Sequence, residues 1–244
     1  MATAETGSAA SVVALHRDGR LVTDYPQVRR LLADADPDEL ARAGRLLARL
    51  DTDEVLRAHP AQAAVSVAVT GHGTLSSLTP ALTAELARHG LLLRPYTADF
   101  DSWVFELSDP GSGLYAADAD LACCVLDAET VLGELPLPWR PEDVERVLAE
   151  KTALLDRLAA RYGATARGTL VLNTLPLPKR ALAQLVDHRS RARMSALWHE
   201  ANARILRLTS DHPALVVLDL DPLAGEGIAV GEPRLHAYAK AYLS

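Results

Sequence analysis

His72, Thr74, Ser76 and Ser77 are residues whose types and spacing could do chemistry. They follow a run of small and β-branched apolar residues that ends in Thr70-Gly71-His72-Gly73-Thr74. Histidine exchanges protons near neutral pH, and a serine hydroxyl becomes a nucleophile when a base lies within hydrogen-bonding reach. In parallel α/β sheets, ligands gather outside the carboxyl ends of the strands. We therefore expect a site in the loop that follows this first apolar run.

The elements that must position this loop are short, continuous apolar runs separated by helical patterns. Such runs are typical of parallel strands buried on both faces. Strands are expected at residues 64–70, 91–96, 121–126, 169–172 and 214–220, and helices at 79–88, 141–162 and 191–208, with Gly90 and Gly163 ending the first two helices. The alternation predicts an α/β fold with a parallel sheet of about five strands and helices on both faces.

The amino-terminal part of the chain has a different pattern. Residues up to about Ser11 are small and polar and are expected to be mobile. From Asp36 to Leu56 apolar residues recur at helical spacing, with Asp36 or Asp38 as the N-cap. We therefore divide the chain into a mobile end and helical lead-in, residues 1–60, and an α/β domain, residues 61–244.

Composition excludes several classes of function. The net charge is −7 and no block of Lys or Arg is present, which argues against nucleic acid as the main partner. Neither a secretory signal nor a run of about eighteen apolar residues occurs, so we expect no membrane segment and a cytoplasmic location. Cys123 and Cys124 are adjacent and would point to opposite faces of a strand, so they are interpreted as reduced core residues.

Several segments, in this order, resemble the amino-terminal half of FkbH-type proteins: VAVTGHGTLSSLTPAL, YTADFDSWVFELSDPGSGLYAADADLACCVLDAE, VLNTLPLP, WHEANARILRL, ALVVLDLDPLA and EPRLHAYAKAYLS. The resemblance runs from about Asp36 to Ser244. It implies an SGNH-hydrolase-like domain of flavodoxin-like architecture. FkbH-type proteins couple such a domain to a haloacid-dehalogenase-type domain and load a glyceryl unit onto an acyl carrier protein in polyketide pathways. We expect this chain to be the SGNH-like half alone.

The chain departs from the SGNH pattern at the nucleophile. SGNH enzymes carry a serine in a GDS-type loop after the first strand, oxyanion donors from a Gly and an Asn, and a DxxH motif near the end. Here Gly73 stands where the serine is expected, and Pro233 lies three residues before His236. If the site is catalytic, the nucleophile is therefore rearranged to Ser76 or Ser77, with His236 or His72 as the base.

Each candidate also has a structural interpretation. Ser76 and Ser77 could simply cap the following helix. His72 is either a base or ligand-recognising group or a solvated loop residue, and His236 either resembles the terminal SGNH histidine or packs on the surface. Asn173 is either an oxyanion donor or a turn residue. Asp219 is either the carboxylate that orients His236 or an ordinary strand-end residue.

No cofactor is expected. Histidines and carboxylates show no zinc spacing, and neither GHG nor GEG belongs to a phosphate-binding loop. Two hypotheses follow. The first is a non-catalytic or weakened binding module whose site, including His72, Gly73, Thr74, Asn173 and Asp219, holds an acyl or phosphopantetheine-linked group. Its expected partners are an acyl carrier protein or a separate haloacid-dehalogenase-type domain. The second is an acyl hydrolase or acyltransferase.

Overall fold

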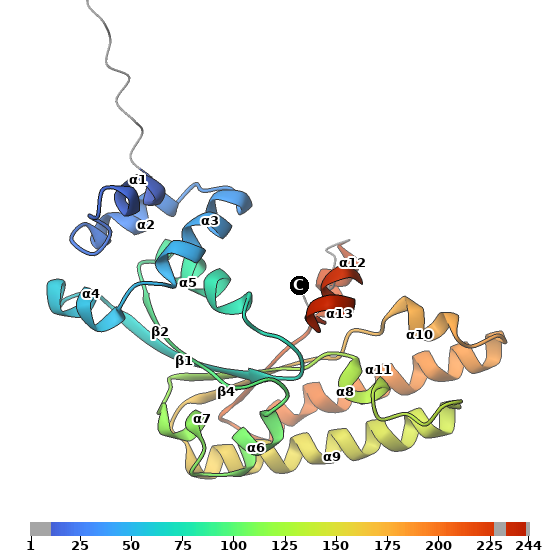
Figure 1. The fold of residues 1–244 in the computed structure, drawn as a ribbon. Helices are drawn as coiled ribbons and strands as arrows, with labels where there is room; N and C mark the ends of the chain where they lie inside the picture. The colour runs from blue at the N-terminus through green and yellow to red at the C-terminus, as the bar shows by residue number, and fades with distance from the viewer. Residues whose placement is uncertain (1–10, 227–232, 243–244) are drawn as a thin grey trace, which may run out of the picture. The chain divides into compact units, whose positions relative to one another are not determined.

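The computed structural model of the protein describes residues 11–226 and 233–242 (Figure 1). The terminal residues that were expected to be mobile lie almost entirely outside this range. The described residues form two compact units by their contacts. The first comprises the described residues up to Ser66 together with Ser76–Pro95, and the second comprises Val67–Leu75 and the described residues from Tyr96 onward. Strands β1 and β2 each begin in the first unit and end in the second.

The first unit is built from short helices around their own hydrophobic core. Asp36 caps one of them through a capping box, since its carboxylate accepts from the Glu39 amide at 2.8 Å and the Glu39 carboxylate accepts from the Asp36 amide. Asp36 is therefore the cap, and the expected lead-in helix is two helices. The elements are α1 (Val12–Arg17), η1 (Tyr25–Gln27), α2 (Val28–Leu32), α3 (Pro37–Leu47), α4 (Thr52–Ala58) and α5 (Leu78–Arg88).

The sheet has five parallel strands in the order β2-β1-β3-β4-β5. This confirms the predicted α/β fold and is the flavodoxin-like strand order. In that order the direction of winding reverses between β1 and β3, where Gly71 pairs with Val125. The strands are β1 (Ala64–Gly71), β2 (Leu92–Thr97), β3 (Leu121–Val125), β4 (Thr169–Asn173) and β5 (Leu215–Leu218).

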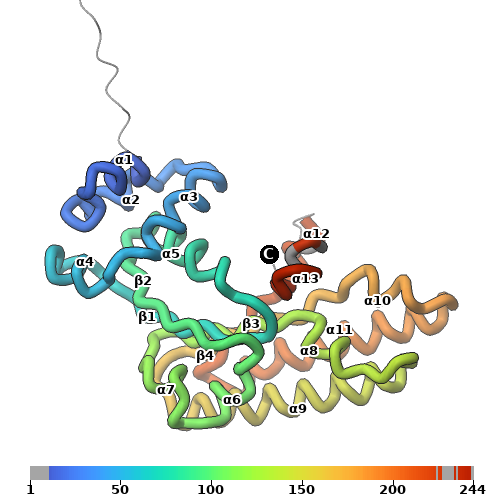
Figure 2. The backbone as a smooth tube through the Cα atoms, viewed as in Figure 1, coloured from blue at the N-terminus to red at the C-terminus, as the bar shows by residue number. Residues whose placement is uncertain are grey.

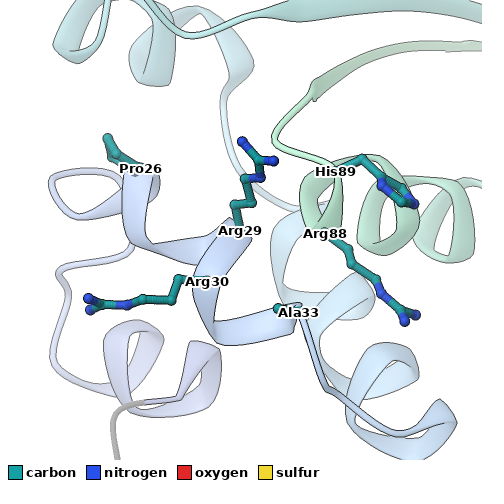
Figure 3. A pocket seen from close by; sticks show the side chains of 6 residues that line it. All are labelled: Pro26, Arg29, Arg30, Ala33, Arg88 and His89. Atoms are coloured by element: carbon teal, nitrogen blue, oxygen red, sulfur yellow. The ribbon is translucent and has the colours of Figure 1, made fainter.

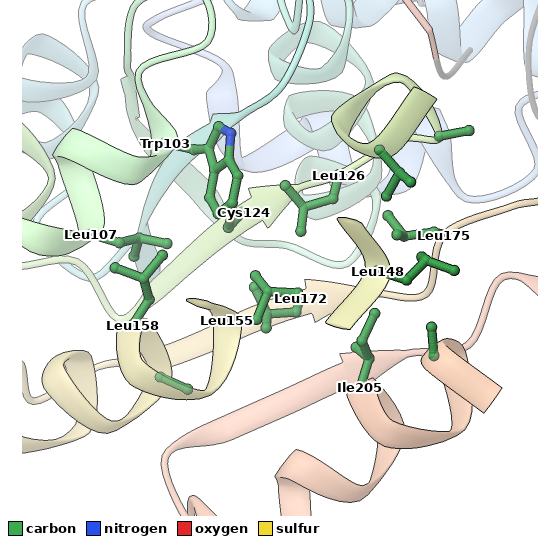
Figure 4. Packing of buried hydrophobic residues seen from close by; sticks show 14 of the residues in the cluster. Trp103, Leu107, Cys124, Leu126, Leu148, Leu155, Leu158, Leu172, Leu175 and Ile205 are labelled. Atoms are coloured by element: carbon green, nitrogen blue, oxygen red, sulfur yellow. The ribbon is translucent and has the colours of Figure 1, made fainter. Parts of the chain in front are cut away.

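The second unit packs two long helices side by side along one face of its strands, as the chain trace of Figure 2 shows. These are α9 (Pro141–Thr165) and α11 (His188–Asp211). Side chains of these two helices and of β4 pack in one hydrophobic core, among them Leu155, Leu172 and Ile205, and Leu107 belongs to the same core (Figure 4). The shorter helices are α6 (Trp103–Ser108), α7 (Gly113–Ala116), α8 (Glu129–Leu132), α10 (Lys179–Ala183), α12 (Asp221–Gly225) and α13 (Pro233–Ala239).

Two expectations about helix ends were wrong. Helix α9 continues through Gly163 and ends at Thr165, because glycine at this position keeps helical geometry instead of turning left-handed. Ser77 does precede α5, but its side chain makes no capping hydrogen bond. Its backbone is already helical, at φ −81° and ψ −21°, whereas a capping hydroxyl requires extended dihedral angles.

Cys123 and Cys124 are both free thiols. Burial raises the pKa of the Cys123 thiol to about 11 and raises that of Cys124 further. Both therefore behave as core residues, as the sequence indicated. No helix in the described part of the chain combines the length and hydrophobicity needed to cross a membrane.

Candidate functional site

His72 and Asp127 meet at the point where the winding of the sheet reverses. His72 is the first residue after β1, and its amide still donates to the Val125 carbonyl on β3 at 3.1 Å. Asp127 is the second residue after β3. The His72 Nδ1 atom lies 3.0 Å from Asp127 Oδ2 and 3.2 Å from Oδ1. Flavodoxin-like sheets bind their ligands outside the carboxyl ends of the strands, at such a reversal of winding.

Asp127 is itself held in place. Its side chain is 3% exposed, and Oδ1 accepts the Glu129 amide at 2.7 Å. The carboxylate fixes the orientation of the imidazole ring, so Nδ1 carries the hydrogen and Nε2 points away from Asp127. Nε2 lies 4.0 Å from Asp101 Oδ1, beyond hydrogen-bonding distance, so no hydrogen bond to a described residue occupies it.

The environment of His72 favours its charged form. Burial of the ring opposes protonation, but the hydrogen bond and negative charge of Asp127 outweigh burial, with further help from Asp101 and Glu129. The net effect raises the pKa of His72 above its usual 6.5. Glu129 also forms an ion pair with Arg180, and this ion pair links α8 to α10.

The carboxyl-terminal segment of the second unit covers His72. The Tyr242 ring stacks on the imidazole, with centroids 5.2 Å apart and planes 17° apart, and the His236 ring contacts Tyr242 edge-on at 4.7 Å. Tyr242 therefore joins the two histidines that the sequence assigned to one site. Burial, followed by the charges of Asp127, Glu129 and Asp101, raises the pKa of the Tyr242 hydroxyl.

Gly73 lies directly beneath this segment. Its φ is +89°, in the left-handed region that favours glycine. A Cβ atom at residue 73 would lie 2.8 Å from the Lys240 carbonyl oxygen and 2.8 Å from Tyr242 Cδ2. The next residue is tied to the same segment, because the Thr74 amide donates to the Lys240 carbonyl at 2.9 Å and its hydroxyl donates to the Ala239 carbonyl at 2.6 Å. The position expected for an SGNH serine thus has no room for a side chain.

Asn173 joins the ends of β3 and β4. Its Oδ1 accepts the Leu126 amide at 2.9 Å, and its Nδ2 donates to the carbonyls of Leu126 at 2.7 Å and Thr174 at 2.8 Å. Both amide hydrogens are engaged and the residue is buried. To donate to an oxyanion, the Asn173 amide would have to break one of these two Nδ2 hydrogen bonds.

The Asp219 side chain is also held by hydrogen bonds, at the end of β5. Its Oδ1 accepts the Thr174 hydroxyl at 3.2 Å and the Asp221 amide at 3.2 Å. The Thr174 oxygen in turn accepts the Leu220 amide at 2.9 Å. This network shapes the strand ends, and the expected pairing of Asp219 with His236 stays a prediction.

Ser76 and Ser77 lie in the exposed turn before α5 and belong to the first unit, whereas His72 and His236 belong to the second. Their assignment as nucleophiles stays a prediction. Within residues 11–226 and 233–242, no group of three or more His, Cys, Asp or Glu side chains is arranged to hold a metal ion.

Sequence reasoning did not include Asp127, Asp101 or Tyr242 among the site residues. Asp127 carried a usable signal, because it follows a buried apolar run just as His72 does. Once β1 and β3 are recognised as neighbours, two polar residues at their ends must meet. Tyr242 carried no such signal, since nothing in its surroundings indicates which strand end its segment covers.

Comparisons with known proteins bear on the fold alone. No protein-family model and no curated protein matches this chain. The chain is similar to the crystal structure of the N-terminal part of the protein BF1531 from Bacteroides fragilis, which contains a phosphatase domain in complex with Mg. The TM-score is 0.67 at 13% identity, over 85% of this chain and 51% of that one. This chain thus spans about half of the BF1531 structure, and the two share a fold.

A second match is to LAE5, an α/β hydrolase from the metagenome of Lake Arreo, Spain. Its TM-score is 0.40 at 16% identity, over 75% of this chain and 89% of that one. A likeness at this level carries no argument about the site.

Proposed function

We propose that this chain is an SGNH-like domain of the FkbH type that binds an acyl or glyceryl group linked to a carrier protein and does not cleave it. The observation that carries the proposal is the packing around Gly73. Lys240 and Tyr242 occupy the space that a serine side chain would need at the expected nucleophile position. Without that nucleophile, the ordinary route of an SGNH esterase is closed.

The state of His72 also favours binding over proton transfer. A raised pKa increases the fraction of imidazolium at any pH, and an imidazolium has no lone pair with which to accept a proton from a serine. It can instead donate from Nε2 to a carbonyl or phosphate oxygen of a bound group. Tyr242 offers an aromatic surface beside that donor.

The likeness to BF1531 agrees with this proposal without deciding it. That structure is about twice as long as the matched region and contains a phosphatase domain. We propose that this chain, too, works beside a separate domain of haloacid-dehalogenase type, which performs the transfer chemistry in polyketide-type biosynthesis. The cytoplasm is the proposed location.

One observation favours the alternative of an acyl hydrolase or acyltransferase. In a catalytic triad, the base is a histidine whose Nδ1 is held by a buried carboxylate. His72 and Asp127 have this arrangement. The missing part is a serine hydroxyl within reach of Nε2. Ser76 and Ser77 are the proposed candidates, with His72 or His236 as the base.

A single experiment separates the two functions. Acetyl-pantetheine is titrated into the ¹⁵N-labelled chain, and the same sample is assayed for thioester hydrolysis. The proposal predicts saturable shifts of the backbone amide signals of Gly73 and Thr74, which both the wild type and the variant retain, with no hydrolysis above the buffer blank. The matched variant is His72→Gln, which removes the cationic donor and should abolish saturation. Hydrolysis that disappears in Ser76→Ala or Ser77→Ala would establish the enzyme instead.

A further inference from the structure

The first unit contains a hollow that none of the assignments above uses. It has a volume of about 470 Å³ and lies between α2 and the carboxyl end of α5 (Figure 3). Three of the six residues that line it are arginines and a fourth is a histidine. The lining residues are Pro26, Arg29, Arg30, Ala33, Arg88 and His89, which we call the arginine surface.

The arginine surface is positive within an acidic chain. No carboxylate in the described part of the chain forms an ion pair with Arg29 or Arg30, and both residues are exposed. The ion pair of Arg88 is with Glu85 on its own helix, at 3.7 Å. The whole chain carries a net charge of −7, so the unpaired positive charge of Arg29 and Arg30 is a local feature. Such a patch attracts and orients an oppositely charged partner.

Arg29 is held in position by the turn after α5. Gly90 has a φ of +83°, and a Cβ atom there would lie 3.0 Å from Arg29 Cδ. The aliphatic stem of Arg29 therefore lies across this glycine. Gln62 fixes the same turn, because its Nε2 donates to the Gly90 carbonyl at 2.7 Å. A side chain that is already ordered loses less conformational entropy when it binds.

The directions of the arginines indicate what kind of anion they suit. Figure 3 shows that the guanidinium groups of Arg29, Arg30 and Arg88 point in three different directions, not toward one common point. A single phosphate group would require converging donors. Carboxylates spaced along a protein surface match divergent arginines, each of which can bind one carboxylate with two parallel hydrogen bonds.

We propose that the arginine surface is a docking site for a protein segment rich in Asp and Glu. It lies within the first unit, so it neither uses nor requires the site around His72. Arginine is among the residues enriched at protein interfaces and at their energetic hot spots.

The test measures binding of a fluorescein-labelled oligoglutamate peptide to the full chain by fluorescence anisotropy at low ionic strength, because salt screens exposed charges. The triple variant Arg29→Gln, Arg30→Gln, Arg88→Gln should bind at least about tenfold more weakly than the wild type. The control is Arg189→Gln, Arg204→Gln, Arg207→Gln. These arginines on α11 are also exposed and form no described ion pair, so the control loses the same charge and should retain the affinity within about twofold.

Two results would overturn the proposal. Equal weakening by both triple variants would mean that only net charge matters. Complete displacement of the peptide by inorganic phosphate, where chloride at the same ionic strength does not displace it, would mean that the hollow binds a small anion. Thermal unfolding of each variant checks that it is folded.

Discussion

The imidazole of His72 is hydrogen-bonded to the buried carboxylate of Asp127, with Nδ1 3.0 Å from Oδ2. The two residues are 55 positions apart in the sequence, and the adjacency of β1 and β3 brings them together. The same relationship orients the ring, raises its pKa and leaves Nε2 without a hydrogen bond to any described residue.

Replacing the carboxylate should lower the pKa of His72. Asp127→Asn keeps an oxygen for the Glu129 amide but removes the charge that favours the imidazolium, so burial should then dominate. The measurement is an NMR titration of the His72 ring nitrogens. Asp101→Asn is the control and should have a smaller effect, because Asp101 is half exposed and lies 4.0 Å away. An unchanged His72 pKa in Asp127→Asn would contradict the assignment.

Stability should depend on pH through the same group. The pKa of His72 is raised in the folded protein, so its contribution is fully present below the usual 6.5 and is lost as the pH rises through the folded value. Chemical denaturation of the wild type and of His72→Gln, at several pH values from about 5.5 to 9, isolates this contribution. The stability difference should shrink as the pH rises. A difference that stays constant or grows would show that the folded pKa is not raised.

Gly73→Ala should destabilise the second unit. The substitution places a left-handed φ of +89° on alanine and drives its Cβ into the Lys240 carbonyl and the Tyr242 ring. Backbone strain of this kind alone costs about 1–3 kcal/mol. Gly19→Ala is the matched control, since Gly19 has a φ of +68° and no atom within 4 Å of the added Cβ. Equal losses of unfolding free energy in the two variants would mean that the carboxyl-terminal segment does not press on Gly73.

Asn173→Ala should lower stability because it leaves buried backbone groups without partners. The Leu126 amide and carbonyl both bond to the Asn173 side chain, and each unsatisfied buried group costs about 1–3 kcal/mol. Thermal unfolding measures the effect. A variant as stable as the wild type would show that this side chain does not bind the strand ends together, and would reopen its role as an oxyanion donor.

Much of the fold could be predicted from hydrophobic pattern. Each of the five strands lies within a few residues of its apolar run, and alternation with helices correctly implied a parallel sheet. The pattern is informative because a strand that is buried on both faces consists almost entirely of apolar residues. Gly163 misled the prediction, since a glycine ends a helix when its backbone turns left-handed and otherwise continues it.

The site could be predicted only in part. His72 was found from its place at a strand end, but Asp127 required knowledge of which strands are neighbours. Tyr242 required the tertiary position of the last segment, which packing determines and local sequence does not. Asn173 was recognised as a strand-end polar residue, yet its hydrogen bonds to Leu126 depend on the β3–β4 pairing.

The most direct test of the central claim is reaction of the wild-type chain with a fluorophosphonate, followed by intact-mass measurement. Because Lys240 and Tyr242 occupy the space beside Gly73, the account predicts no stoichiometric adduct. Diisopropyl fluorophosphate on a serine hydrolase, treated in parallel, shows that the reagent is active. One adduct per chain, lost in Ser76→Ala or Ser77→Ala and in His72→Gln, would contradict the account and identify an enzyme.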